Sequence, residues 1–178
     1  ILSLTGCLTK QKITHLAEAE NQIITQEGRH FFTSSSGIAE WHYEDGRKKL
    51  SFIETDCDTL NGIVSIEDWL IAVCADSKLI NPIHKLIKID LSNINPSTNK
   101  PTVSTLFELT NIALPNGLAM TPNQDAVLIA NYNLLGQGFI SRLELNYTDA
   151  DLSAGEFDLK YLNNNHGIAS TNGIKFFN

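Results

Sequence analysis

The chain has 178 residues, of which 42% are hydrophobic, 19% charged and 8% aromatic, and its formal net charge at pH 7 is −7. This is the composition of an ordinary globular protein with a hydrophobic core. Because nucleic-acid binding needs clustered cations and the sequence has no run of Lys and Arg, we expect no nucleic-acid partner.

The first residues end in a motif that resembles the lipobox of bacterial lipoproteins. A lipobox consists of Leu, a small residue, Gly or Ala, and Cys, and Leu4-Thr5-Gly6-Cys7 matches it. The resemblance implies that residues 1–7 end a signal peptide, that Cys7 is lipidated and that residues 8–19 are a tether. It predicts an exported protein held on a membrane by a lipid anchor, in the periplasm or at the outer membrane. The alternatives are an ordinary apolar N-terminal segment and a secreted protein.

From residue 20 onward, short apolar runs alternate with turn residues. Runs of β-branched and aromatic residues separated by Gly, Asp and Asn are typical of antiparallel strands. The first unit has expected strands at 22–25, 30–33, 37–43 and 49–54. The second has expected strands at 62–66, 69–75, 85–90 and 102–108, with a connecting loop at 92–101. The third has expected strands at 117–121, 126–130, 139–145 and 156–162, with a turn at 146–148.

Two cysteines, Cys57 and Cys74, remain beside Cys7. In an exported protein they could pair, but two cysteines do not define a disulfide framework. Cys74 lies in the apolar run 69–75, where a free cysteine behaves as a small buried hydrophobe. The sequence therefore favours free thiols and leaves the pairing open.

A dyad of Asn and Gly recurs at Asn61, Asn116 and Asn172, at intervals of 55 and 56 residues, and a weaker copy starts at Glu20. Repeats of about this period are typical of propellers, solenoids and arrays. The absence of convincing helical segments excludes α/β folds, which need helical crossovers. A β-sandwich is the competing all-β fold, but sandwich strands rarely repeat at a fixed interval. We predict an all-β fold of the β-propeller type.

The expected domain is a partial β-propeller over residues 20–178, with blades that start near residues 20, 61, 116 and 172. The full protein is expected to have about six four-stranded blades, of which three and a fraction are present. Open sheet edges invite further pairing, so we expect this piece not to fold stably alone.

The recurring Asn predicts a metal site. The innermost strand of each propeller blade lines the central channel, so side chains at the starts of these strands converge. We expect Glu20 (or Asn21), Asn61, Asn116 and Asn172 to form a ring of oxygen ligands for Ca²⁺, or for another divalent cation. Each Gly would let the backbone turn tightly, so that the amide points inward. The alternative is that each dyad is only a turn before a strand.

Two segments, 19–38 and 114–130, resemble the calcium-dependent propellers of the senescence marker protein/gluconolactonase superfamily. This superfamily includes strictosidine-synthase-like proteins and paraoxonase-type arylesterases, and the resemblance spans about residues 20–178. It implies that Glu20 is the acidic ligand and that Asn61 and Asn116 are the ligands from the second and third blades.

The sequence departs from this superfamily at two positions. Asn172 stands where the family usually has an Asp that binds calcium and is proposed as general base. An amide cannot accept a proton at neutral pH, so this residue argues against catalysis and for weaker calcium binding. Gly62 stands where paraoxonases have an Asp for a second calcium, so we expect no second site there.

The resemblance implies a calcium-dependent hydrolase of lactones or aryl esters. Calcium would polarise the carbonyl group and stabilise the oxyanion formed by attack of water. The candidate catalytic residues are Asn116, through the metal, and His166, a loop residue that could act as the base. The alternative is a non-catalytic, lipid-anchored propeller that serves as a binding scaffold, which Asn172 favours.

Overall fold

A computed structural model describes residues 19–35, 37–45, 47–78, 81–132, 138–162 and 174. These residues form twelve β-strands and contain no helix, so the predicted all-β class is confirmed. Accordingly, the described part of the chain has no helix long and apolar enough to cross a bilayer.

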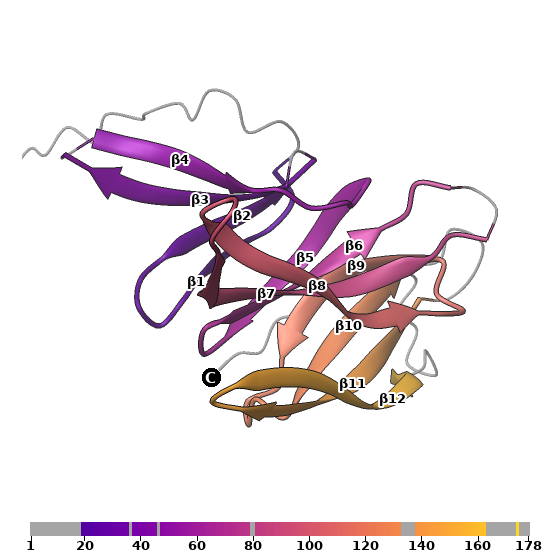
Figure 1. The fold of residues 1–178 in the computed structure, drawn as a ribbon. Coiled ribbons are helices and arrows are strands. Elements are labelled where there is room, and N and C mark those ends of the chain that lie inside the picture. Colours follow the sequence, from indigo (N-terminus) through magenta and orange to yellow (C-terminus); the bar gives the residue numbers. More distant parts are fainter. Residues whose placement is uncertain are drawn as a thin grey trace, which may run out of the picture.

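The strands form three four-stranded antiparallel sheets, each a meander of consecutive strands (Figure 1). Sheet A contains β1 (Gln22–Ile24), β2 (His30–Ser34), β3 (Gly37–Glu44) and β4 (Arg47–Ile53). Sheet B contains β5 (Thr59–Ile66), β6 (Trp69–Ala75), β7 (His84–Asn95) and β8 (Lys100–Leu109). Sheet C contains β9 (Leu114–Met120), β10 (Ala126–Tyr132), β11 (Phe139–Thr148) and β12 (Asp151–Leu162).

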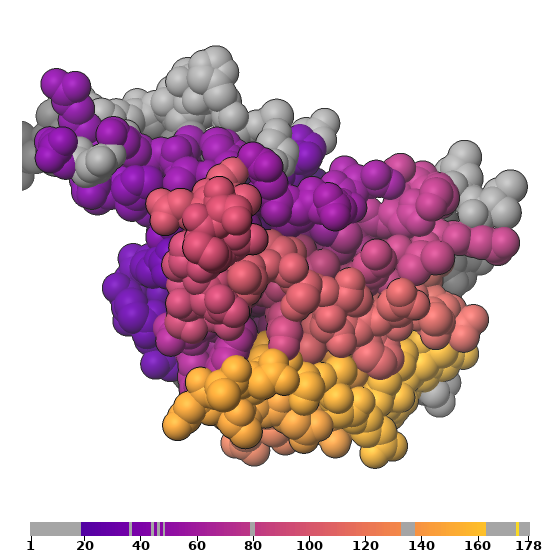
Figure 2. Space-filling view, in the orientation of Figure 1, coloured from indigo at the N-terminus to yellow at the C-terminus, as the bar shows by residue number. Residues whose placement is uncertain are grey.

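The three sheets lie side by side as successive propeller blades do. The first strand of sheet B, β5, contacts both β1 and β9, and the last strands of sheets B and C, β8 and β12, also touch. In Figure 2 sheet B, coloured purple to pink, lies between sheet A and sheet C. The first strands are therefore the inner strands, as expected for a propeller.

Strand β6 shows why sheet B occupies the middle. All seven of its residues are buried. Since side chains alternate between the two faces of a strand, Trp69 and Ile71 join the cluster with sheet C, whereas Leu70 and Ala72 join the cluster with sheet A. An apolar run without polar alternation is what a strand covered on both faces requires.

Two expected connections are wrong because strands continue through them. Strands β7 and β8 extend into the predicted loop 92–101, and a tight turn joins them. Asn95 closes this turn: its side-chain Oδ1 accepts from the Ser97 amide at 2.9 Å, and its carbonyl accepts from the Asn99 amide at 2.8 Å. Asn99 has a φ of 53°, which Asn tolerates well. Residues 146–148, the other expected turn, belong to β11 and pair with β12.

The expectation of free thiols is also wrong, because Cys57 and Cys74 form a disulfide. Cys74 pairs with Leu60 across β5 and β6, and Cys57 lies three residues before Leu60, just ahead of the start of β5. Their Cα atoms lie 5.3 Å apart, within the range that a disulfide bridges. The apolar surroundings of Cys74 did not distinguish the two states, because disulfide sulfur is buried as readily as a thiol.

Candidate functional site

The first Asn-Gly dyad lies inside a strand and forms a β-bulge. The pairing of β5 with β6 shifts between Leu60 and Ile63, so that Asn61 and Gly62 lie opposite the single residue Val73. A bulge bends its strand and redirects a side chain.

Sheet C repeats this bulge at the second dyad. The pairing of β10 with β9 shifts between Ile129 and Asn131, so that Asn116 and Gly117 lie opposite Ala130. These two dyads are thus placed in strands and not in the turns that lead into them.

Sheet A has the same irregularity just before β1. The Glu20 amide donates to the Thr33 carbonyl at 3.2 Å, and the Thr33 amide donates to the Asn21 carbonyl at 2.9 Å. Glu20 and Asn21 therefore share one partner residue, as the dyads at Asn61 and Asn116 do. It follows that Glu20, Asn61 and Asn116 occupy the first bulge position in three adjacent inner strands.

The Gly of the first dyad is required by a close approach between sheets. A Cβ atom on Gly62 would lie 2.4 Å from the Leu118 amide nitrogen and 2.7 Å from the Asn116 carbonyl oxygen. Among the glycines of the described residues, positive φ values occur at Gly28 and Gly37, so Gly62 has an ordinary backbone conformation. The expected tight turn is replaced by contact between β5 and β9.

Asn61 links the two bulges. Its Nδ2 donates to the Pro115 carbonyl at 2.9 Å, immediately before Asn116 in β9. This bond fixes the plane of the amide and directs Oδ1 away from the Pro115 carbonyl. A carboxylate could not make the bond, because it has no donor.

Three of the four predicted calcium ligands, Glu20, Asn61 and Asn116, lie in the part of the chain that the structure describes. Asn61 and Asn116 are half-buried and Glu20 is exposed, whereas Asn172 and His166, like Cys7, lie outside the described residues. Carboxylate and amide oxygens are donor types that suit Ca²⁺, so the chemistry of Glu20, Asn61 and Asn116 fits that ion. Within the described ranges, no group of three or more His, Cys, Asp and Glu side chains could hold a metal by itself.

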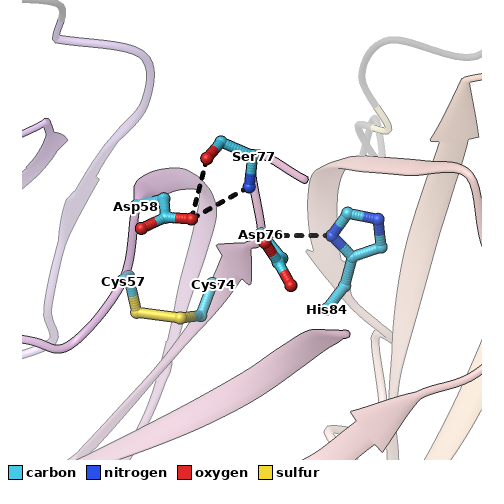
Figure 3. Close-up of a disulfide and its surroundings, with 6 residues drawn as sticks. All are labelled: Cys57, Asp58, Cys74, Asp76, Ser77 and His84. Atoms are coloured by element: carbon cyan, nitrogen blue, oxygen red, sulfur yellow. Dashed lines mark hydrogen bonds between the residues drawn. A yellow bond between two sulfur atoms is a disulfide. The ribbon is translucent and has the colours of Figure 1, made fainter. Parts of the chain in front are cut away.

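His84, a residue that the sequence did not single out, lies at the same end of the sheets. It is only 1% exposed. Its Nδ1 accepts from the Asp76 amide at 3.1 Å, as Figure 3 shows, and its Nε2 lies 3.0 Å from the Ala113 carbonyl. An amide donor on Nδ1 and a carbonyl acceptor at Nε2 require the neutral ring with its proton on Nε2. Burial lowers the pKa of the His84 imidazole, against a smaller opposing effect of the Ala113 hydrogen bond.

Carboxylates fix the loop between β6 and β7 (Figure 3). Asp58 Oδ2 accepts from the amide and the hydroxyl of Ser77, at 3.0 and 2.9 Å. Asp76 accepts from the amides of Ile83 and Lys78, at 3.0 and 2.9 Å, and these bonds lower its pKa to about 2. Both carboxylates thus have a structural use.

A polar cavity of about 270 Å³ opens beside the disulfide. Its charged lining residues are Asp56, Asp58, Asp76, Glu108, Lys78 and Lys85. Two of these four carboxylates, Asp58 and Asp76, accept hydrogen bonds from backbone amides of the loop. We therefore assign the polar lining of this cavity to stabilisation of the loop.

Comparison with known proteins supports the fold. No protein-family model and no curated protein matches the chain. Among solved structures, the chain is similar to the crystal structure of a protein from Bacteroides fragilis proposed to be a 6-phosphogluconolactonase. The TM-score is 0.55 and the identity 17%, over 90% of this chain and 42% of that chain. The chain therefore spans less than half the length of that protein, and the similarity shows the fold. The superfamily resemblance given above stays a prediction.

Proposed function

We propose that this chain is part of a β-propeller enzyme that hydrolyses lactones, with the active site where the inner strands begin. The observation that carries the proposal is the repeated bulge, which brings Glu20, Asn61 and Asn116 to equivalent positions in adjacent strands. The protein of similar fold is itself proposed to act on a sugar lactone, which supports this substrate class.

In this proposal, Glu20, Asn61 and Asn116 would hold a calcium ion, with Asn172 as a fourth ligand. When bound, calcium would supply Lewis-acid polarisation of the lactone or aryl-ester carbonyl. Glu20 provides the formal negative charge among these residues. Asn61 presents its amide oxygen while its nitrogen is held by Pro115. His166 is the proposed base that takes the proton from the attacking water.

A second candidate function is a non-catalytic scaffold. The hydrogen bond from Asn61 to Pro115 favours it, because this bond gives Asn61 a structural use that needs no metal. For either function we propose an exported, lipid-anchored protein. The Cys57–Cys74 disulfide supports export, because disulfides persist in oxidising compartments.

Hydrolysis assays on the full-length protein separate the two functions. The substrates are a phosphorylated sugar lactone, an unphosphorylated sugar lactone and an aryl acetate, each with and without a chelator. The enzyme proposal expects chelator-sensitive turnover that falls by about 10²-fold or more in Asn116→Ala, as on loss of a key electrostatic group. Asn93→Ala, on the exposed end of β7, is the matched control and keeps full activity. Calcium binding without turnover of any of the three substrates would support the scaffold.

A further inference from the structure

Residues Ala113–Asn116, which we call the leading segment, run into the sheet C bulge and are hydrogen-bonded by side chains of sheet B. His84 Nε2 donates to the Ala113 carbonyl at 3.0 Å, and Asn61 Nδ2 donates to the Pro115 carbonyl at 2.9 Å. At the far end of this segment, the Asn116 carbonyl lies close to Gly62. A Cβ atom added to Gly62 would lie 2.7 Å from the Asn116 carbonyl oxygen. The position of Asn116 therefore depends on the neighbouring sheet as well as on its own.

The His84 ring contacts two separate segments of the chain through its two nitrogens. One ring joins the loop after β6, through the Asp76 amide, to the leading segment, through the Ala113 carbonyl. His84 pairs with Leu109 of β8, which belongs to the cluster between sheets B and C, so the ring lies on the face turned toward sheet C.

Asp76, in the loop, is the charged residue that acts on the ring, and against the larger effect of burial its charge raises the pKa of the imidazole. Asp58 and Lys78 line the cavity beside the same loop. Lys85 on the same strand and Glu108 on β8 are cross-strand neighbours in the register, and both lie on the opposite face of the sheet from His84. Residues 110–116, which include the leading segment, carry no charged side chain.

We propose that His84 is a positioning residue for Asn116, which it holds in place through the Ala113 carbonyl while its ring is neutral. This inference rests on the proposed function of Asn116. Protonation would place a donor on Nδ1 opposite the Asp76 amide, which is also a donor, so the loop would separate from the ring. Nε2 would keep its proton and still donate to the Ala113 carbonyl, but the ring would no longer be fixed by the loop, so it would hold the leading segment less firmly.

The test compares three variants of the full-length protein in the lactone assay. His84→Phe makes neither hydrogen bond and is expected to lower kcat roughly tenfold with little change in KM, as outer-shell positioning groups do. His84→Gln has a donor for Ala113 and does not titrate at this position, so it is expected to recover most of kcat and to decline less steeply toward acid pH than the wild type, in which both His84 and the proposed base His166 titrate. His30→Gln, on β2, should match the wild type in both respects. A wild-type kcat in His84→Phe, or an acid decline in His84→Gln as steep as that of the wild type, overturns the proposal.

A second readout works without catalysis. Hydrogen–deuterium exchange over residues 113–118 is expected to be faster in His84→Phe than in His84→Gln or the wild type, after correction for intrinsic rates. ¹⁵N NMR of the imidazole should show the Nε2-protonated tautomer at neutral pH. If no lactone is turned over but both results hold, the proposed function fails and the positioning role of His84 stands. Unchanged exchange in His84→Phe, or a ring protonated on Nδ1 at neutral pH, overturns the positioning role of His84.

Discussion

Gly62 is the residue at which the geometry of the site is most tightly constrained. Replacing it with Ala would put a methyl group against the backbone of β9, where no flexible side chain can yield. We expect Gly62→Ala to destabilise the protein by about 3 kcal/mol, the upper range for overpacking. Urea unfolding measures the change. Gly28→Asn is the comparison, and we expect it to cost less: a Cβ atom at Gly28 meets nothing within 4 Å, so its cost is limited to the strain of a side chain at a φ of +80°, which Asn adopts more readily than most residues. Equal stability of Gly62→Ala and the wild type would contradict the close approach.

Asn61 and Asn116 are equivalent in the repeat but differ in their contacts. Asn61→Asp loses the donor to Pro115 and brings a negative charge near a carbonyl oxygen. We expect it to reduce stability by about 1–3 kcal/mol, the cost of a hydrogen-bonding group left unsatisfied. Asn116→Asp is the matched substitution and is expected to strengthen calcium binding, because it adds a carboxylate. Thermal unfolding with and without calcium checks both. Stabilisation of Asn61→Asp in the absence of calcium would refute the assigned role of its amide nitrogen.

The titration of His84 predicts how stability changes with pH. The pKa of the folded imidazole lies below its ordinary value of 6.5, so the unfolded chain binds more protons between the two values. The contribution to stability is therefore complete above about pH 6.5 and declines as pH falls toward the folded pKa. Unfolding midpoints measured from pH 8 to pH 5 should fall for the wild type and fall less for His84→Gln. An identical slope in the two proteins would show that the decline has another source.

At the scale of elements, the disulfide ties the segment before β5 to the end of β6. The bridge closes a loop of sequence separation 17, for which the chain-entropy relation gives a stabilisation of about 3 kcal/mol. We expect the double variant Cys57→Ala/Cys74→Ala to lose about this much in chemical unfolding. A reducing agent should lower the unfolding midpoint of the wild type and leave that of the double variant unchanged. If the reductant shifts both equally, the bridge is not the cause.

The elements themselves were predictable from local patterns. Short apolar runs indicate all twelve strands, and the recurring dyad by itself aligns Asn61 with Asn116. The bulges were not predictable, because a bulge is defined by a partner strand that the pattern does not show. The same limit applies to His84, whose partner Ala113 lies 29 residues away, and to the continuation of β7 toward Asn95, where exposed polar residues resemble a loop.

At the scale of the whole molecule, sheet A differs from sheet B in having one face turned away from the other sheets. Its residues Phe31 and Ile38 pack toward sheet B. By register, Ile24, His30 and Trp41 lie on the opposite face, and Tyr43 follows two residues later on the same side. Ile24 is 62% exposed and Tyr43 is 69% exposed. In a propeller this is the face that a further blade would cover.

An exposed apolar sheet face predicts self-association of the 178-residue chain when it is produced by itself. Light scattering after size exclusion should give a mass that rises with protein concentration. Ile24→Glu/Tyr43→Glu should reduce this association, because two charges would have to be desolvated at the contact. Ile94→Glu/Val103→Glu adds the same charge at exposed apolar positions of sheet B and serves as the control. A monomeric wild-type chain at all concentrations, or an equal effect of the two double variants, would show that this face of sheet A does not drive association.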